Sequence, residues 1–164
     1  MSQVEIVRYS PGMADELTSM WHRSFTRALA PFRDPHSPDD RRRFLEETLS
    51  QRAEVLVAVS GRDILGFMAQ RGPDIEALYL HVNHQGQGLG GRFITRAKRA
   101  SPDYLHLYAF QRNLRARRFY RRHGFTEIAQ GYINMEGLAD VELEWWPRGA
   151  SCRPLQGLSD REER

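Results

Sequence analysis

The stretch Gln85-Gly86-Gln87-Gly88-Leu89-Gly90-Gly91 constrains this chain more than any other. An apolar run, Ile75 to Val82, leads into it, and a helical pattern, Leu89 to Ala97, follows it. A glycine-rich turn between a strand and a helix leaves backbone N–H groups unpaired, and these groups attract an anion together with the helix dipole. Gly86, Gly88 and Gly90 lack side chains, so a ligand can approach the main chain closely. The turn is therefore predicted to hold the pyrophosphate of a nucleotide-type cofactor.

Two other phosphate-binding motifs fit the stretch less well. Gly86-x-Gly88-x-x-Gly91 matches the dinucleotide fingerprint, but a lone match of that kind is weak. The fingerprint also requires an acidic residue after the next strand, and the run 104–110 is followed by Gln111. No Gly-Lys-Ser/Thr follows the turn, which excludes a nucleotide-hydrolase phosphate loop. The same residues can also be written Gln85-x-x-Gly88-x-Gly90.

Apolar spacing and turn residues predict the order of the elements. Helices are predicted at 13–29, 37–50, 89–97 and 113–123, and strands at 4–9, 54–60, 64–70, 74–82, 104–110, 125–133 and 141–146. The strands at 54–82 form an antiparallel meander, and the strand at 104–110 is parallel to the last of them because a helix makes the crossover. This order, β-α-α-β-β-β-α-β-α-β-β, predicts an α+β fold with a mixed β-sheet and helices on both faces.

Length and cysteine content indicate one cytoplasmic domain. The chain has 164 residues and one cysteine, Cys152, which excludes an intrachain disulfide and a cysteine-based zinc cluster. No stretch approaches the roughly 20 apolar residues of a membrane span, and the first residues lack a signal-peptide pattern. We expect a domain over 1–147 and a disordered tail over 148–164, which is rich in Gly, Ser, Pro and charge.

The net charge of +3 is mild, and the arginines are interpreted as solvated helix faces. A nucleic-acid partner is disfavoured, because its footprint would be more one-sided. No histidine pair has convincing metal-ligand spacing with a third partner, so no metal is expected. Trp21, Trp145 and Trp146 are interpreted as core or dimer-contact aromatics, which leaves a homodimer open.

The glycine motif and the element order resemble the GNAT superfamily of acetyl-CoA-dependent N-acetyltransferases, over roughly residues 4–146. In that family Gln/Arg-x-x-Gly-x-Gly/Ala cradles the pyrophosphate of coenzyme A. Leu78-Tyr79-Leu80-His81-Val82 resembles the fourth GNAT strand, Leu-Tyr-Val-x-Pro, with Val82 in place of proline. The resemblance implies acetyl-CoA as co-substrate. The residues that it places at the cofactor are Leu78, Leu80, Val82, Gln85, Gly86, Gln87, Gly88, Gly90, Gly91 and Asn113.

A second family motif contains Tyr120. The run Asn113-x-x-Ala116-x-x-Phe119-Tyr120-x-x-x-Gly124-Phe125 resembles the GNAT pattern Asn-x-x-Ala-x-x-Phe-Tyr-x-x-x-Gly-Phe. The leaving group of acetyl-CoA is a thiolate, to which a phenol can give a proton. The resemblance therefore implies Tyr120 as the general acid, whereas a purely structural interpretation makes it a core aromatic. Asn113 is implied to bond the pantetheine or its neighbouring loop, and it also suits a helix cap.

Acyl transfer to an amine also needs a base, because a free amine of pKa ~10 is mostly protonated at neutral pH. Strand alternation predicts that Asp74, Glu76, Leu78 and Leu80 share one face of their strand. Glu76, acting directly or through water, is the first candidate for the base and Asp74 the second. The competing interpretation is that both are solvated acids at the start of a strand.

The predicted function is transfer of the acetyl group of acetyl-CoA to a primary amine by direct attack in a ternary complex. No cysteine near the motif supports a covalent acyl-enzyme. The acceptor, a small-molecule or peptide amine, is not identified by the sequence, because fold does not fix function. The alternatives are a non-catalytic acyl-CoA-binding sensor on the same fold and, less well supported, a basic nucleic-acid-binding module. No membrane partner is expected.

Overall fold

In the computed structural model, which describes residues 3–150, seven strands form one mixed sheet in the order β1-β2-β3-β4-β5-β7-β6. The strands are β1 (Glu5–Arg8), β2 (Glu54–Ser60), β3 (Asp63–Arg71), β4 (Asp74–Leu80), β5 (Leu105–Phe110), β6 (Thr126–Ile133) and β7 (Ala139–Trp145). All neighbouring pairs are antiparallel except β4 and β5, which are parallel. The predicted α+β class and its one parallel step are confirmed.

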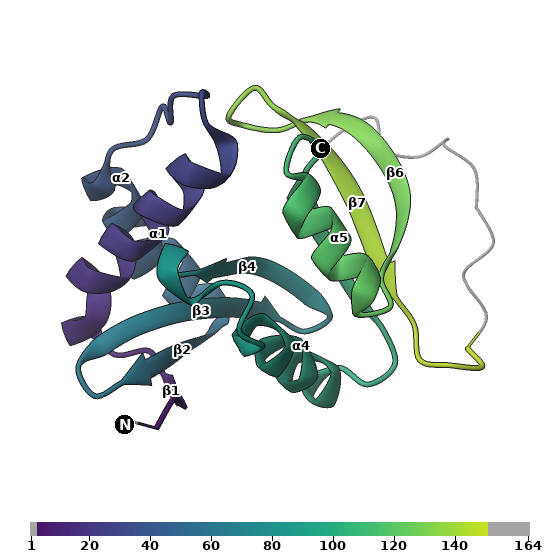
Figure 1. Ribbon diagram of the computed structural model, residues 1–164, viewed down its shortest axis with the longest axis horizontal. Helices are drawn as coiled ribbons and strands as arrows, with labels where there is room; N and C mark the ends of the chain where they lie inside the picture. Colours follow the sequence, from purple (N-terminus) through teal and green to yellow (C-terminus); the bar gives the residue numbers. More distant parts are fainter. Residues whose placement is uncertain (1–2, 151–164) are drawn as a thin grey trace.

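Helices cover both faces of this sheet, as predicted. They are α1 (Ala14–Leu29), α2 (Pro38–Phe44), α3 (Ser50–Arg52), α4 (Leu89–Ala100) and α5 (Leu114–Arg122), with the short turns η1 (Pro11–Met13), η2 (Leu45–Leu49) and η3 (Val82–His84). Figure 1 shows α1 and α2 on one side of the molecule and α5 beside β6 and β7 on the other. The single helix predicted at 37–50 is α2, a π-helical turn (η2) and α3 in succession. Ser37 caps it by accepting a hydrogen bond from the Asp40 backbone N–H, as its position predicts.

Each face of the sheet has its own hydrophobic core. On one side α1 buries Leu17, Met20 and Phe25 in a cluster with residues of β2, β3 and β4. On the other side α4 buries Phe93 and Ile94 in a second cluster with β5 and β7. These are the apolar faces that helical periodicity predicts, and their burial provides most of the driving force for folding.

The parallel strands β4 and β5 separate soon after they begin. Their register has one pair, Asp74 opposite His106, at the start of both strands. Beyond that pair β4 continues with β3, and β5 with β7. Side chains of α1 and α5 therefore line a common cleft at the carboxyl ends of β4 and β5, which is where open α/β sheets commonly bind ligands.

A β-bulge in β4 corrects one prediction. Ala77 pairs with Ala69 and Ile75 with Gln70, which leaves Glu76 between them without a partner on β3. Ile75 consequently packs in the α4-side core and Ala77 in the α1-side core, although plain alternation would put both on one face. The prediction that Glu76 shares a face with Leu78 and Leu80 by strand alternation is therefore wrong.

The structure does not test the predicted C-terminal tail. The tail predicted at 148–164 falls largely on 151–164, which lie outside the described residues together with Cys152. The boundary at 147 stays a prediction. Across residues 3–150, no helix has both the length and the apolar character that crossing a membrane requires.

Candidate active site

A cleft of about 680 Å³ lies between α1, the end of β4, the glycine turn and α5. Most of the predicted cofactor residues and the predicted acid meet there. Those that line it are Leu78, Leu80, Gln85, Gly86, Gly88, Gly90, Gly91, Asn113 and Tyr120. The structure thus brings together the two sequence motifs, which are separated by more than twenty residues along the chain.

The glycine turn opens its backbone to the cleft. Gly86 and Gly88 have φ angles of 74° and 85°, a region that favours glycine, and Gly88 is the N-cap of α4. A Cβ atom on Gly88 would meet no heavy atom within 4 Å, so the main chain there is accessible to a ligand. Because α4 is twelve residues long, its first N–H groups form an anion site at this point. The turn therefore fits the pyrophosphate of coenzyme A.

Gly90 has a different reason to be glycine. A Cβ atom on Gly90 would lie 2.9 Å from two ring carbons of Phe119. The absence of a side chain at Gly90 lets α4 and α5 approach each other, so Phe119 can pack beside the cleft that both residues line. The last glycine of the motif thus fixes the position of α5, and with it that of Tyr120.

Three arginines line the cleft, although the sequence analysis interpreted the arginines only as solvated helix faces. Arg27 comes from α1, and Arg115 and Arg122 come from α5. The guanidinium nitrogen Nη2 of Arg115 lies 3.6 Å from the position of a Cβ atom on Gly86. These cations suit the phosphate groups of coenzyme A. The signal that could have revealed them is the position of Arg115 directly after Asn113-Leu114 in the second motif.

Two predicted cofactor residues do not line the cleft. Val82 begins η3, and the side chain of Gln87 donates a hydrogen bond to the Asn83 carbonyl at 3.1 Å. Gln85 lines the cleft, but its side-chain amide donates to the Leu80 carbonyl at 3.2 Å. The glutamine of the motif therefore closes the turn onto the end of β4 and leaves ligand contact to the backbone.

A second, smaller cavity of about 80 Å³ lies on the α1 side of the gap between β4 and β5. Tyr79, Asn113 and Tyr120 line both the cleft and this cavity. Asn113 caps α5 by accepting a hydrogen bond from the Ala116 backbone N–H at 3.1 Å, so its cap and site positions are compatible. A group bound in the cleft and a group entering the cavity would meet at the residues that the two share.

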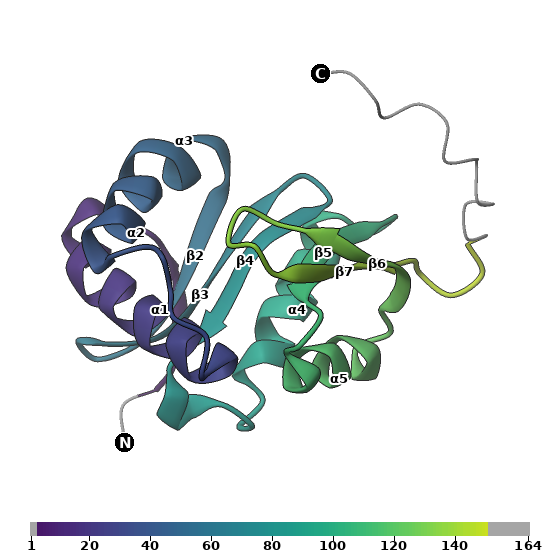
Figure 2. The same cartoon turned by 90° about the horizontal axis from the view of Figure 1, so that it is seen from above.

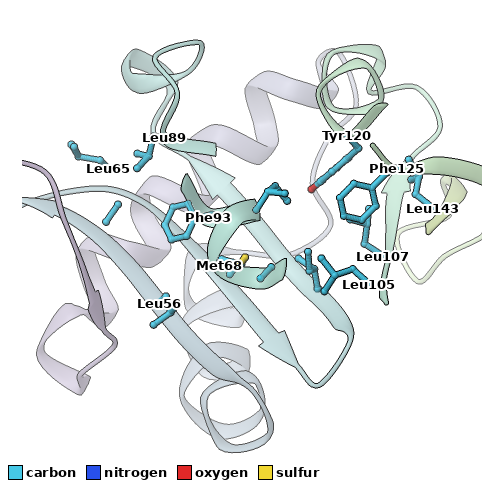
Figure 3. Packing of buried hydrophobic residues seen from close by; sticks show 14 of the residues in the cluster. Leu56, Leu65, Met68, Leu89, Phe93, Leu105, Leu107, Tyr120, Phe125 and Leu143 are labelled. Atoms are coloured by element: carbon cyan, nitrogen blue, oxygen red, sulfur yellow. The ribbon is translucent and has the colours of Figure 1, made fainter. Parts of the chain in front are cut away.

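Tyr120 is buried where the two cavities meet, with 8% of its surface exposed. It packs against Phe119 and Phe125, and Figure 3 shows its side chain extending from α5 toward the centre of the molecule. Burial, with a smaller contribution from Tyr79, raises the pKa of Tyr120 above its usual value. The phenol therefore stays protonated across the pH range of ordinary assays and can act as a proton donor.

The two predicted bases lie in ion-pair networks. Glu76 lines the small cavity, but both of its carboxylate oxygens form ion pairs. Oε2 lies 2.8 Å from Arg52 Nε, and Oε1 lies 2.9 Å from Arg71 Nε. Asp74 lies at the start of β4, where its carboxylate is 3.1 Å from His106 Nδ1, and it lines neither cavity. Asp74 therefore does not reach the cleft. The carboxylate of Glu76 is paired with two guanidinium groups.

A buried carboxylate that the sequence did not single out lies next to the small cavity. Asp140, at the start of β7, is 8% exposed and pairs across the sheet with Phe110, which lines that cavity. Its Oδ1 accepts from the Asn134 side-chain amide at 2.8 Å. Burial, reinforced by the nearby Glu136, raises the pKa of Asp140 to about 6.

This raised pKa predicts a pH-dependent cost to stability. The folded state holds the Asp140 proton more tightly than the unfolded chain, so stability should fall as pH rises from about 4 to about 6 and stay lower above that. Asp140→Asn should remove this loss, raising the free energy of unfolding at pH 7.5 by roughly 1–2 kcal/mol with no gain at pH 4. Denaturant unfolding of both proteins at the two pH values tests it, and an equal effect at both would contradict it.

Comparison with known proteins identifies the family. Residues 51–127 match the model of the acetyltransferase (GNAT) domain. A curated relative, the probable N-acetyltransferase Rv2775 of Mycobacterium tuberculosis, is 31% identical in a 123-residue alignment that covers 65% of this chain and 68% of that protein. The chain belongs to the GNAT acetyltransferase family. The resemblance inferred from the two motifs is thereby confirmed.

Solved GNAT structures share the fold. A GCN5-related N-acetyltransferase from Rhodopseudomonas palustris superposes with a TM-score of 0.75 at 20% identity, over 90% of this chain and 98% of that chain. The yncA protein of Salmonella typhimurium, a putative acetyltransferase solved with acetyl-CoA, superposes with a TM-score of 0.67 at 19% identity, over 93% and 99% of the two chains. At these identities the likeness establishes the GNAT fold.

Proposed function

We propose that this GNAT protein transfers the acetyl group of acetyl-CoA to a primary amine by direct attack in a ternary complex. The observation that carries the proposal is that Tyr120, a buried and protonated phenol, lies in the wall shared by the cleft and the small cavity. The glycine turn and the arginines would hold the anionic end of acetyl-CoA in the cleft. The amine would enter from the α1 side, through the small cavity.

In this reaction acetyl-CoA supplies a thioester, whose carbonyl carbon the amine nitrogen attacks. A C–N bond forms, the C–S bond breaks, and the sulfur leaves as a thiolate. Tyr120 gives its proton to that sulfur, which stabilises the leaving group as its charge develops. The phenolate then regains a proton from solvent. No acyl-enzyme is involved.

The amine must also lose a proton, and we propose that water takes it rather than Glu76 or Asp74. Two guanidinium groups hold the Glu76 carboxylate, and Asp74 pairs with His106 at the other end of β4. A carboxylate held in this way contributes to the fold by fixing the bulge of β4 to the ends of α3 and β3.

Glu76→Gln tests this assignment. We expect turnover within about threefold of wild type, with the acid limb of the pH–rate profile unchanged, and a free energy of unfolding lower by roughly 1–2 kcal/mol because Arg52 and Arg71 lose their partner. Asp74→Asn, which also removes one strand-start carboxylate, is the matched control. An acid limb that shifts in Glu76→Gln alone would give the base role back to Glu76.

The function itself is tested by thiol release from acetyl-CoA with a panel of amines, amino acids, polyamines, aminoglycosides and peptide N-termini. We expect at least one amine to release thiol and to gain one acetyl group by mass spectrometry. Acetyl-CoA binding without transfer to any acceptor would instead favour a non-catalytic sensor.

A further inference from the structure

One face of the sheet beyond the small cavity carries an unusual set of side chains. On this side α1, α2 and α3 lie beside β2, β3 and β4 (Figure 2). Among the described residues no helix covers β6 and β7 on this side, because α5 packs with the core on the opposite face. We define the acidic–aromatic face by the side chains that β5, β7 and β6 direct there: His106, Tyr108, Asp140, Glu142, Glu144 and Tyr132. Tyr108 and Tyr132 are 49% and 67% exposed, so much of this face is open to solvent.

The carboxylates of this face differ from others in the protein. Glu127, on the opposite side of the same hairpin, pairs with Arg117 and Arg121, and Glu76 pairs with two arginines as well. Within residues 3–150, by contrast, the partners of Asp140, Glu142 and Glu144 are Asn134, His106, Tyr104 and Trp146, with no lysine or arginine among them. A chain with 24 basic and 21 acidic residues thus leaves a negative row along β7, which complements a cationic ligand.

Aromatic rings lie between these carboxylates. The ring centroids of Tyr108 and Tyr132 are 6.1 Å apart, and those of His106 and Tyr108 are 5.0 Å apart. Glu144 accepts from the Tyr104 hydroxyl at 2.8 Å, and His106 Nε2 is 2.7 Å from Glu142. Exposed ring faces next to carboxylates bind ammonium groups through cation–π and charge–charge attraction.

The face is continuous with the small cavity. Tyr108 lines that cavity, and so does Phe110, the cross-strand partner of Asp140. Asp140 also lies close enough to Tyr79, which lines both cavities, to act on the pKa of its phenol. An elongated ligand can therefore place one end at the cavity and extend along β7.

We infer that the acceptor is a linear aliphatic polyamine, whose reacting amine enters the small cavity while its other ammonium groups lie along the acidic–aromatic face. This inference rests on the proposed acetyl transfer. It goes beyond it in naming the class of the acceptor and the residues that select it.

The spacing of the face fits this class of ligand. Side chains two residues apart on one face of a strand are about 6.6 Å apart, which is the spacing between Asp140, Glu142 and Glu144 along β7. Five single bonds of about 1.5 Å in an extended zigzag, as between amines separated by four methylenes, span roughly 6 Å. The backbone of β7 is paired on both sides, with β5 and with β6, so a peptide lying along β7 would find few partners there for its amides. A polyamine has no amides to satisfy.

The experiment compares kcat/KM, at saturating acetyl-CoA, for butylamine, 1,4-diaminobutane, spermidine and spermine. We expect kcat/KM to rise several-fold with each added ammonium group and the rise to shrink at high salt. The double variant Glu142→Gln/Glu144→Gln should lower kcat/KM for spermine roughly tenfold and for butylamine less than twofold, because each exposed ion pair contributes up to about fivefold. Glu47→Gln, the same change on an exposed helical residue elsewhere, should behave as wild type.

A flat series from butylamine to spermine would overturn the inference while leaving acetyl transfer intact. A lysine-rich peptide used in preference to spermine would also overturn it. A third outcome would also overturn it: the wild-type protein is a dimer, Glu142→Lys dissociates the dimer, and the amine series is flat. The acidic–aromatic face would then be an interface with a second copy of the chain.

A second measurement separates this inference from the proposed function. If no amine releases thiol, calorimetric titration of spermine into the coenzyme A-saturated protein still decides the matter. Binding that weakens roughly tenfold in the double glutamine variant, and not in Glu47→Gln, supports the face as a polyamine site. No binding to wild type overturns it.

Discussion

Tyr120→Phe should lower kcat by 10²- to 10⁴-fold and leave the affinity for acetyl-CoA within about twofold of wild type. Only a hydroxyl is lost, and the ring keeps its packing against Phe119 and Phe125. The effect should be large because the phenol is buried at the junction of the two cavities, where the sulfur of acetyl-CoA would have few other proton donors. Single-turnover rates and calorimetric titration with acetyl-CoA measure the two quantities.

A matched control is available in Tyr9→Phe. The Tyr9 hydroxyl is also buried, and burial is the main cause that raises its pKa, but this residue follows β1 and lines neither cavity. Its loss should leave kcat unchanged. Full activity of Tyr120→Phe would reduce Tyr120 to a packing residue and remove the general acid from the mechanism.

Gly88→Asp should weaken acetyl-CoA binding by about 100-fold or more, because it directs a carboxylate toward the place where the pyrophosphate would lie. The fold should survive, since a Cβ atom on Gly88 meets nothing within 4 Å and aspartate is among the residues that tolerate a positive φ such as the 85° of Gly88. Calorimetric titration gives the affinity, and thermal unfolding shows whether the protein remains folded.

Gly88→Asn separates charge from backbone strain in this experiment. Asparagine has nearly the same shape as aspartate and also tolerates a positive φ. It should lose less than about tenfold in affinity. If the two variants weaken binding equally, strain or bulk explains the loss and the anion site is not at this turn.

The parts of the site that could be predicted from sequence depend on local signals. The glycine turn, the N-cap Asn113 and the closing glycine of α5, Gly124 with a φ of 88°, each depend on a few neighbouring residues. The strands follow from apolar runs bounded by turn residues. Because these signals lie in fixed order along the chain, they also determine the parallel step that opens the cleft.

The corrections come from interactions between distant residues. No glycine or proline marks the bulge at Glu76, and its two arginine partners come from the ends of α3 and β3. The cleft position of Arg27 depends on how α1 lies against the end of β4, which helical periodicity does not specify. In the sequence Asp140 is one of several acids on an alternating strand. Its distinct environment comes from the fold, in which Asn134 at the hairpin tip donates a hydrogen bond to it.

Direct transfer in a ternary complex is tested most directly by quenched single turnovers of acetyl-CoA on excess enzyme, with and without an amine that passes the thiol-release screen. The protein and the amine are then both weighed by mass spectrometry. The structure predicts that the amine gains one acetyl group for each coenzyme A released, and that the protein mass stays unchanged when the amine is left out. A protein that gains an acetyl group from acetyl-CoA alone, and passes it on when the amine is added, would contradict direct attack.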